Sequence, residues 1–508
     1  MRVRHRLLPA LAVLVRAVAL VACATGAGTP PADGSRALPG GPAPASEPGP
    51  ILAGAAARTI TPDVKEGGSP VRMAGFGPGR DAQGVHDDLD ARALVLQAGS
   101  RSVALVALDL IGLFHDDVVR IREEIRARHP EAAVEYVMVA STHTHAGPDI
   151  LGLWTPPERT VDAGYVARVR AQVVEAVAGA WARRRPARLS FASARLPQLI
   201  EDSRLPRVID DLALMMKVDA ADGRSTIATL VDFADHPESL GRENNLISSD
   251  YPGATRRALE ERFGGTSIFF SADIGGLLTP LDAGDLLDPD TGRPVPRKSY
   301  RMTELLGQAI ASALGDAWSG GAAPGSPPDR VERAALEIRA REFRVPLANP
   351  RFARGLSEGH LWPRERDAEG ALRSEAAVLS VLAEAVPDPP AGDPVTVGAR
   401  LATRAQFACV PGEIYPELVI GGIQDPQDPG ADIQKAPREP ALRSLMAGRE
   451  RFVLGLCNDE LGYIIPMSEW DEQPPFAYGR TGPQYGEVNS TGPRTAPILL
   501  ELFADLLR

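Results

Sequence analysis

The order of hydrophobic and polar positions predicts alternating strands and helices. Short apolar or β-branched runs, typical of buried strands, occur at 102–110, 134–140, 211–218, 225–234, 267–272, 395–402, 405–410 and 451–456. Longer stretches repeat apolar residues at helical spacing, at 115–129, 162–184, 251–263, 299–318 and 374–386. Because helices can bury the apolar faces of such strands, this mixture predicts an α/β fold. We expect one large domain in which helices flank a mixed sheet.

The N-terminal residues follow a different pattern. The basic stretch MRVRHR precedes a mostly apolar run at 7–22, which ends in Leu20-Val21-Ala22 before Cys23. This order is typical of a secretory signal, and the last four residues resemble the lipobox of bacterial lipoproteins. We expect residues 1–22 to be a lipoprotein signal peptide and Cys23 to become the lipidated first residue. An ordinary signal peptide cleaved nearby is the alternative.

The residues after Cys23 cannot form a core of their own. Residues 24–50 are nearly all Ala, Gly, Pro and Ser, a composition typical of flexible tethers. We therefore predict a lipidated cysteine and linker at 23–50 and a folded domain at 51–508. The expected location is the cell envelope, on its periplasmic or cell-surface side, with a membrane surface as partner through Cys23.

Composition limits the classes of partner and the state of the cysteines. The chain has 508 residues and a formal net charge of −11, so the basic face of a general nucleic-acid binder is not expected. Besides Cys23, the sequence contains only Cys409 and Cys457. In an exported protein these two can form a disulfide. Each also lies in an apolar run, so two buried thiols remain the alternative.

Several predicted strands end beside side chains that can bind a metal ion. Residues 137–149 read VMVASTHTHAGPD, so His143 and His145 directly follow an apolar strand. Four predicted strands are each followed by one possible ligand: His143, His236, Glu413 and Tyr463. In α/β sheets, ligands bind where the carboxyl ends of strands open into loops. Two imidazoles, a carboxylate and a phenol suit zinc better than magnesium or calcium. A polar loop of hydrogen-bonded histidines is the alternative interpretation.

These segments resemble the neutral/alkaline, non-lysosomal ceramidase family. The shared motifs run in the family's order and cover most of the chain from about residue 58 to 495. They include MAGFG (73–77), ASTHTHAGPD (140–149), VDFADHPESLG (231–241), SSDYPG (248–253), FSADIGGLLTP (270–280), VPGEIYPEL (410–418) and LGYIIPMSEW (461–470). The resemblance implies the hydrolysis of the N-acyl amide of ceramide, or of a ceramide-like lipid, to a sphingoid base and a fatty acid.

The resemblance also assigns roles to single residues. It implies that His143, His236, Glu413 and Tyr463 bind a catalytic Zn²⁺, and that His145 lies beside the metal without binding it. His145 would then act as a general acid and base. Tyr463 would adjust the zinc or stabilise the oxyanion of the tetrahedral intermediate. We further expect acidic side chains to orient the imidazoles, with Asp109, Asp235 and Asp250 as candidates.

The sequence departs from the family in two places. A Gly-Asp-Val-Ser-Pro-like stretch of the family, with a catalytic Ser, corresponds here to GGLLTP at 275–280. Thr279 stands where that Ser would be, so we include it among the catalytic candidates, with a structural turn as the alternative. Full-length ceramidases also carry a C-terminal β-sandwich. The last residues here are helix-like, so we expect that domain to be absent.

Two other functions stay open at this point. The chain could be a zinc hydrolase that acts on a different acyl amide or ester. It could also be a catalytically inactive, surface-binding lipoprotein, which the altered GGLLTP stretch would fit.

Arg204 is an uncertain counterpart of a substrate-binding Arg of the family. Either Tyr478 or Tyr485 is expected to reach the site.

Overall fold

Twelve of the described strands join into one mixed sheet. Their order is β11-β9-β8-β6-β1-β13-β14-β15-β17, and β3, β4 and β5 branch from β1. The strands are β1 (Gly49–Thr59), β3 (Asp90–Ala98), β4 (Arg101–Leu108), β5 (Tyr136–Ser141), β6 (Arg185–Arg195), β8 (Leu212–Ala220), β9 (Thr226–Phe233), β11 (Thr266–Ser271), β13 (Arg333–Val345), β14 (Leu372–Glu384), β15 (Leu401–Cys409) and β17 (Glu450–Leu454). The pairs β4–β5, β9–β11 and β15–β17 are parallel, whereas the other pairs in this sheet are antiparallel.

The computed structural model describes residues 47–508, apart from 66, 282–283, 285, 321–329 and 385–400. The described residues belong to one compact unit. The signal peptide predicted at 1–22, the lipidated Cys23 and most of the predicted linker lie outside the described residues.

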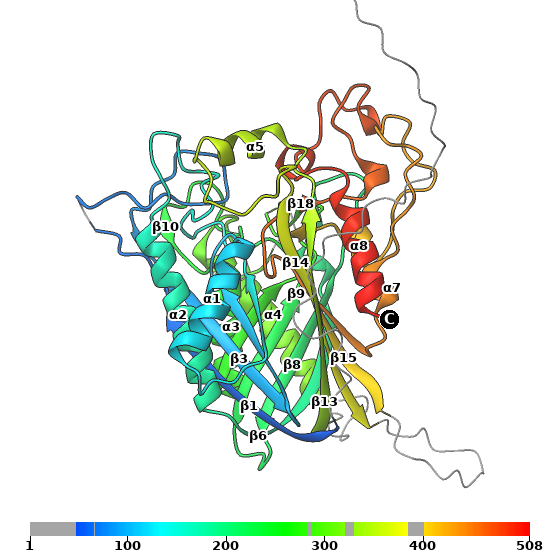
Figure 1. The fold of residues 1–508 in the computed structure, drawn as a ribbon. Helices are drawn as coiled ribbons and strands as arrows, with labels where there is room; N and C mark the ends of the chain where they lie inside the picture. Colours follow the sequence, from blue (N-terminus) through cyan, green and yellow to red (C-terminus); the bar gives the residue numbers. More distant parts are fainter. Residues whose placement is uncertain (1–46, 66, 282–283, 285, 321–329, 385–400) are drawn as a thin grey trace, which may run out of the picture. The chain divides into compact units, whose positions relative to one another are not determined.

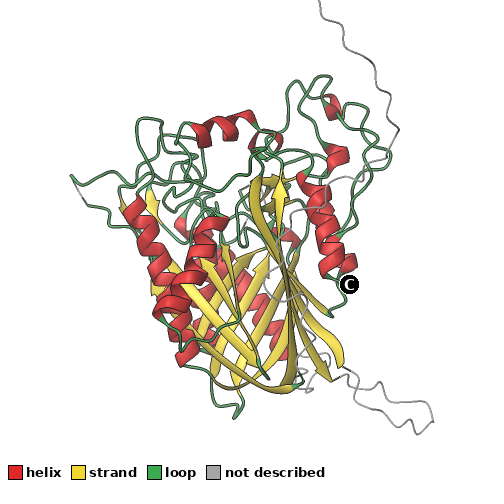
Figure 2. Ribbon diagram, in the orientation of Figure 1, coloured by secondary structure: helices red, strands yellow, loops and turns green. Residues whose placement is uncertain are grey.

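Helices flank the sheet, as the sequence predicts (Figures 1 and 2). They are α1 (His115–Arg128), α2 (Ala163–Ala182), α3 (Asp250–Phe263), α4 (Tyr300–Gly320) and α8 (Thr495–Leu506). Helix α2 packs on β1 and β3 with α1 beside it, α3 and α4 pack together on β11 and β6, and α8 packs on β13 and β14. The predicted α/β class, with a large mixed sheet between helices, is confirmed.

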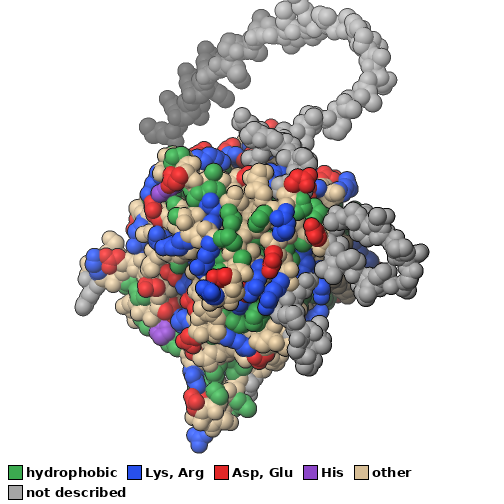
Figure 3. Space-filling model, turned by 90° about the horizontal axis from the view of Figure 1, so that it is seen from below, with side chains coloured by type: hydrophobic (Ala, Val, Ile, Leu, Met, Phe, Trp, Pro, Cys, Tyr) green, Lys and Arg blue, Asp and Glu red, His purple; other side chains and the backbone are tan. Residues whose placement is uncertain are grey.

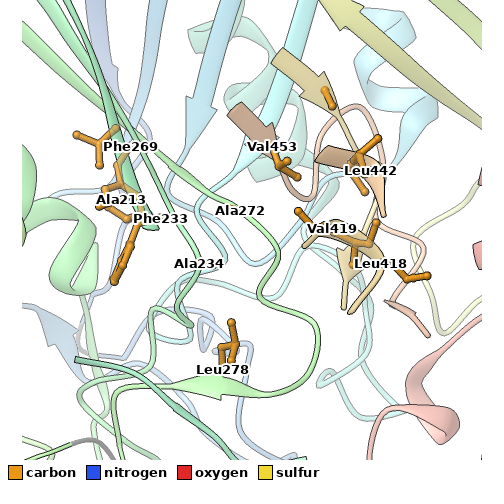
Figure 4. Packing of buried hydrophobic residues seen from close by; sticks show 14 of the residues in the cluster. Ala213, Phe233, Ala234, Phe269, Ala272, Leu278, Leu418, Val419, Leu442 and Val453 are labelled. Atoms are coloured by element: carbon orange, nitrogen blue, oxygen red, sulfur yellow. The ribbon is translucent and has the colours of Figure 1, made fainter. Parts of the chain in front are cut away.

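The side chains of each strand alternate between two cores. In β14, Ala377 and Leu379 face an inner core that also contains Leu105 of β4 and Phe407 of β15. Successive strand residues point to opposite faces, so Val378 lies in a second core shared with α4 and α8. Figure 4 shows part of this second core, including side chains of β9 and β11. Because both faces are covered, the central residues of β14, at 376–379, are apolar on both faces.

One predicted helix is wrong. The stretch 374–386 is rich in Ala, Leu and Glu, which favour helices, but most of it is strand β14. Strand β14 pairs with β13 along eleven positions and with β15 on its other edge. A central position between two partner strands outweighs local helix propensity here, because burial and cross-strand pairing decide the conformation.

Short elements occupy the loops that follow the strands. Three two-stranded sheets pair β2 (Gly84–Val85) with β10 (Leu246–Ile247), β7 (Glu201–Asp202) with β12 (Leu278–Thr279), and β16 (Glu413–Ile414) with β18 (Tyr463–Ile464). The short helices are α5 (Pro350–Ser357), α6 (Pro416–Val419) and α7 (Leu442–Leu445). In Figure 1 many of these loops gather at the top, where α5 and β18 are labelled. The predicted site residues lie in these loops.

The two cysteines of the described region form a disulfide. Cys409, the last residue of β15, is bonded to Cys457, which follows β17, across a sequence separation of 48. Of the two alternatives that the sequence left open, the structure therefore shows the disulfide. The bond closes a loop that contains Glu413 and lies close in sequence to Tyr463.

Surface charge and helix hydropathy indicate whether a chain has strongly charged or membrane-spanning regions. Basic and acidic side chains are interspersed on the face shown in Figure 3. Among the helices that the structure describes, none combines the length and hydropathy needed to cross a bilayer.

A buried aspartate in β9 gives a prediction for stability. Asp232 accepts a hydrogen bond from the backbone N–H of Val453 at 2.9 Å, and its Oδ1 has no partner. Burial raises the pKa of Asp232 to about 8, although Val453 and Arg443 act to lower it. The folded state therefore keeps a proton that the unfolded chain loses near its ordinary pKa of 3.8. This group's contribution to stability falls as pH rises from about 4 to about 8.

We expect Asp232→Asn to stabilise the protein at pH 8, by on the order of 2–4 kcal/mol, because the amide needs no protonation. The advantage should shrink as pH falls toward 4. Urea unfolding of both proteins across this pH range measures the difference. The exposed Asp63→Asn serves as the matched control. A gain that does not change with pH would contradict the assignment of the effect to Asp232 ionisation.

Candidate metal centre and its cavity

The loop after β5 holds His143 in a strained backbone conformation. Its φ is 68°, in the left-handed region that non-glycine residues seldom occupy. The N–H of His143 donates to the carbonyl of Leu110 at 2.9 Å, and the N–H of Thr142 donates to Leu108 at 2.8 Å. These two bonds continue the edge of β4 into the loop. Such strain collects at functional sites, where the surrounding structure stabilises it.

Two imidazoles are oriented by backbone carbonyls. His143 Nδ1 lies 2.6 Å from the carbonyl oxygen of Ile111, and His236 Nδ1 lies 2.6 Å from that of Leu278. Each Nδ1 must donate its hydrogen in such a bond, so each Nε2 keeps a lone pair. The two ring centroids are 5.3 Å apart. Both imidazoles are buried and can present Nε2 to a common point.

A short parallel ladder places Glu413 beside Tyr463. Strands β16 and β18 pair with Glu413 opposite Tyr463, and the N–H of Glu413 donates to the carbonyl of Gly462 at 3.0 Å. Glu413 Oε2 lies 3.1 Å from His236 Nε2 and 3.5 Å from His143 Nε2. The structure therefore brings together His143, His236 and Glu413 from three separate loops, with Tyr463 next to Glu413.

The charges at this point suit a cation. Burial lowers the pKa of His143 to about 3, so its imidazole is neutral. Burial acts to raise the pKa of Glu413, but His143 and His236 lower it below the ordinary value. Burial acts to lower the pKa of His236, but Glu413 and Glu238 raise it above the ordinary value. A neutral imidazole and an ionised carboxylate are the forms that bind metals, and a bound cation would displace a proton from His236. His143, His145 and His236 also have ring nitrogens within 4.8 Å of one another, which marks a possible metal-binding group.

A carboxylate that the sequence analysis missed contacts His145. Glu238 Oε2 lies 3.3 Å from His145 Nδ1, and Thr279 donates from Oγ1 to Glu238 Oε1 at 2.5 Å. Burial acts to raise the pKa of Glu238, but the contacts with His145 and Thr279 lower it to about 2. The three side chains form a chain from His145 through Glu238 to Thr279. Glu238 lies two residues after His236 in DHPES, a signal that could have been noticed.

Among the residues that the structure describes, no hydrogen bond joins an imidazole to the three aspartates expected to orient the rings. Asp109 accepts two hydrogen bonds from Arg256, at 2.6 and 2.7 Å. Asp250 accepts from Ser239, and no hydrogen bond connects Asp235 to an imidazole. Backbone carbonyls take the orienting role, and a sequence cannot show in advance which carbonyls will point inward.

A cavity opens beside the candidate metal ligands. His143, His145, Glu413 and Tyr463 line one part of it. Most of the remaining wall is apolar: Ile111, Phe114, Leu151, Leu153, Trp154, Phe352, Leu356, Leu361, Leu372 and Leu461. Tyr485 also lines the cavity, whereas Tyr478 donates to Gln424 elsewhere, so Tyr485 is the tyrosine that reaches the site.

Arg204 has structural partners outside the cavity. Arg204, the uncertain substrate-binding candidate, is 1% exposed and donates to Glu487 at 3.0 Å. Its guanidinium lies over the Tyr415 ring, and that ring lies edge-on to Tyr463. Arg204 therefore supports Tyr463 from behind and does not line the cavity described above.

A second group of possible metal ligands has arginine partners. It consists of His115, Glu342 and Glu375. Glu375 pairs with Arg122 at 2.7 Å, and Glu342 pairs with Arg373. Two guanidiniums already neutralise these carboxylates, so this group is a weaker candidate than the one around His143.

Known proteins resemble this chain in sequence and in fold. Residues 52–286 match the family described as neutral/alkaline non-lysosomal ceramidase, N-terminal. The chain is 24% identical over 268 residues to the neutral ceramidase of Pseudomonas aeruginosa, which covers 46% of this chain and 39% of that protein. The match thus spans about two fifths of that relative's length.

Solved structures show the same fold. The crystal structure of the Pseudomonas aeruginosa neutral ceramidase superposes with a TM-score of 0.65 at 18% identity, over 90% of this chain and 74% of that one. A ceramidase described as complexed with C2 gives 0.64 at 17% identity, over 90% and 75%. The resemblance predicted from the sequence is confirmed, and so is the fold class.

Proposed function

We propose that this chain, which resembles the neutral/alkaline ceramidases in sequence and in fold, is a zinc-dependent amidohydrolase. Its substrate would be ceramide or a ceramide-like lipid, cleaved at the N-acyl amide to a sphingoid base and a fatty acid. The observation that carries the proposal is the meeting of His143, His236 and Glu413 at the end of an apolar cavity. A lipid with a single amide needs this combination of a polar reaction centre and an apolar chamber.

The residues present fit a zinc ion. Two imidazole Nε2 atoms and one carboxylate oxygen face each other, with the Tyr463 hydroxyl as the fourth donor that we propose. This donor set is typical of catalytic zinc, and the carbonyl bonds to Nδ1 hold the rings as zinc-binding histidines are held. A zinc ion bound there would polarise the amide carbonyl and make a water molecule more acidic.

The protein's own residues supply the proton transfers and the orientation. His145 would receive a proton from the water molecule that attacks the amide and would return it to the leaving nitrogen. Glu238 Oε2 lies 3.3 Å from His145 Nδ1, so this carboxylate would keep the ring in place for these transfers. Tyr463, which lines the cavity next to Glu413, would help to stabilise the oxyanion of the tetrahedral intermediate. Thr279 contacts none of these atoms and acts through Glu238.

The proposal is tested by incubating the purified chain with ceramide in detergent micelles and measuring released fatty acid, with and without a zinc chelator. We expect release that stops with the chelator and returns when zinc is added back. Cleavage of other acyl amides or esters, but not of ceramide, would keep the metal site and overturn the substrate. No hydrolysis of any acyl substrate would favour the inactive binding lipoprotein.

The contact between Glu238 and His145 gives a prediction for the rate. We expect Glu238→Gln to lower kcat by about 10- to 100-fold, because the amide cannot accept the Nδ1 hydrogen as well as a carboxylate can. KM and the zinc content should change little. Thr279→Val should give a smaller loss, and Thr279→Ser should restore the rate.

The matched control is Glu243→Gln, which changes an exposed glutamate of the same loop. Steady-state kinetics on ceramide and metal analysis of each variant provide the comparison. Equal kcat in Glu238→Gln and the wild type would show that the His145–Glu238 contact has no catalytic role.

We also propose that the chain is exported and anchored through a lipid on Cys23. The order of basic residues, an apolar run and Leu20-Val21-Ala22 before Cys23 supports this. The anchor would keep the site near a membrane, where a lipid substrate is found. Cys23→Ala should release the protein from the membrane fraction, and an unchanged distribution would contradict the anchor.

A further inference from the structure

The apolar cavity contains a polar position next to the metal-binding residues. Glu460 and Arg364 both line the cavity among leucines and aromatic rings. Glu460 is 6% exposed, and the Arg364 side chain is 4% exposed. Charged residue types are seldom buried in an apolar wall unless they have a partner or a function there.

Each of these two side chains has one buried atom without a partner. Glu460 Oε1 accepts from the N–H of Gly462 at 2.8 Å, but Oε2 has no hydrogen bond. Arg364 donates from Nη2 to Asp459 at 2.6 Å and from Nη1 to the Glu460 carbonyl at 3.1 Å, but its Nε has none. A buried polar atom without a hydrogen-bond partner costs free energy. A ligand group that forms hydrogen bonds with both atoms would remove this cost.

The polar atoms at this position suit a hydroxyl group. Asp459, which is fully buried, balances the guanidinium of Arg364, so Arg364 needs no anionic ligand. Glu460 Oε2 has no partner and can pair with one further polar group. A hydroxyl group fits, because it accepts from Arg364 and also pairs with the second oxygen of Glu460.

The backbone connects this position directly to the metal-binding residues. Gly462 donates its N–H to Glu460 Oε1 and accepts at its carbonyl from the N–H of Glu413. Tyr463 is the next residue. One peptide unit therefore fixes the distance between the Glu460 carboxyl and the reaction centre, and a group bound at Glu460 lies close to the scissile amide.

We propose that Glu460 and Arg364 form a subsite for a hydroxyl group carried by the substrate close to its scissile amide. The chain would then prefer hydroxylated N-acyl lipids over their plain counterparts. The hydroxyl can come from the acyl chain or from the long-chain base, depending on which of them enters the cavity. That the ligand is a substrate rests on the proposed function.

The test compares two matched substrate pairs with the zinc-loaded full chain. In the first pair the acyl chain carries or lacks a 2-hydroxyl, and in the second the long-chain base carries or lacks a 4-hydroxyl. We expect kcat/KM to be roughly 10- to 100-fold higher for the hydroxylated member of one pair, since a site that pairs with a hydroxyl rejects the analogue without it. The pair that responds identifies the source of the hydroxyl.

Two variants separate the subsite from general damage. Glu460→Met should remove the preference, whereas Glu460→Gln should keep it, because its amide still accepts from Gly462 and donates to the hydroxyl. Glu369→Met, at an exposed glutamate, is the control and should keep the wild-type preference. Equal kcat/KM within both pairs, or a preference that persists in Glu460→Met, would overturn the proposal.

A binding measurement distinguishes an error in the proposed subsite from an error in the proposed function. Trp154 lines the same cavity, so its fluorescence should report the binding of the same four amides. If no amide is hydrolysed, the proposed function is wrong, yet a tighter Kd for the hydroxylated member would still support the subsite. Equal affinities within both pairs would refute the subsite whether or not hydrolysis occurs.

Discussion

Replacing His143 with alanine is expected to lower kcat/KM for ceramide by at least about a thousandfold. The substitution removes one of two imidazole nitrogens that face Glu413, and a carboxylate with a single imidazole holds zinc weakly. Alanine keeps the left-handed strain of this position, so the substitution adds no new backbone cost and changes mainly the metal site. A large loss of activity with a normal unfolding transition is the expected combination.

The control for His143→Ala is His129→Ala, at the end of α1. His129 contacts Glu131 and Glu175, away from the metal-binding residues. Ceramide hydrolysis and thermal unfolding are measured for both variants. If His143→Ala keeps more than about a tenth of the wild-type activity, the proposed zinc site is wrong, because a lost ligand should cost far more.

Removing the disulfide is expected to destabilise the fold by about 4 kcal/mol. Cys409 and Cys457 close a loop of 48 residues, and the loss of a cross-link of this length frees the unfolded chain by about that amount in the chain-entropy model. The same bond ties the end of β15 to the segment after β17. Since Glu413 and Tyr463 follow these strands, activity should be lost at a lower temperature than in the wild type.

The measurement is urea unfolding of the Cys409→Ser, Cys457→Ser double variant beside the wild type, each with and without a reductant. We expect the reductant to destabilise only the wild type, down to the level of the double variant. A wild type that is as stable with the reductant as without it, although its thiols become reactive, would show that the bond adds no stability.

Sequence patterns predicted the elements whose apolar residues follow a regular helix or strand pattern. The helices at 115–129, 162–184, 251–263 and 299–318 and the strands that precede the site occur where they were expected. Strands β1, β6 and β13 were not predicted from the sequence, because they are rich in Ala and Arg, which have low β propensity or are seldom buried. For β14, helix propensity pointed the wrong way, and only its two partner strands account for its conformation.

The candidate site was predictable where a single possible metal ligand follows a single apolar strand. The sequence could point to His143, His236, Glu413 and Tyr463 because each comes soon after an apolar run, and the resemblance gave them an order. It could not find the Glu238–Thr279 contact or the Glu460–Arg364 position, because these depend on how separate loops meet. Nor could the predicted helix at 115–129 show that the ring of His115 is buried against the carbonyl of Asn458.

The zinc content of the purified chain is the sharpest test of the proposed metal site. Protein prepared without chelators is analysed for metals by mass spectrometry, beside a folded His236→Ala variant. We expect about one zinc per wild-type chain and almost none in the variant, because His236 is one of the proposed ligands. A wild-type chain that cleaves ceramide without bound metal, or a variant that keeps its zinc, would contradict the proposed site.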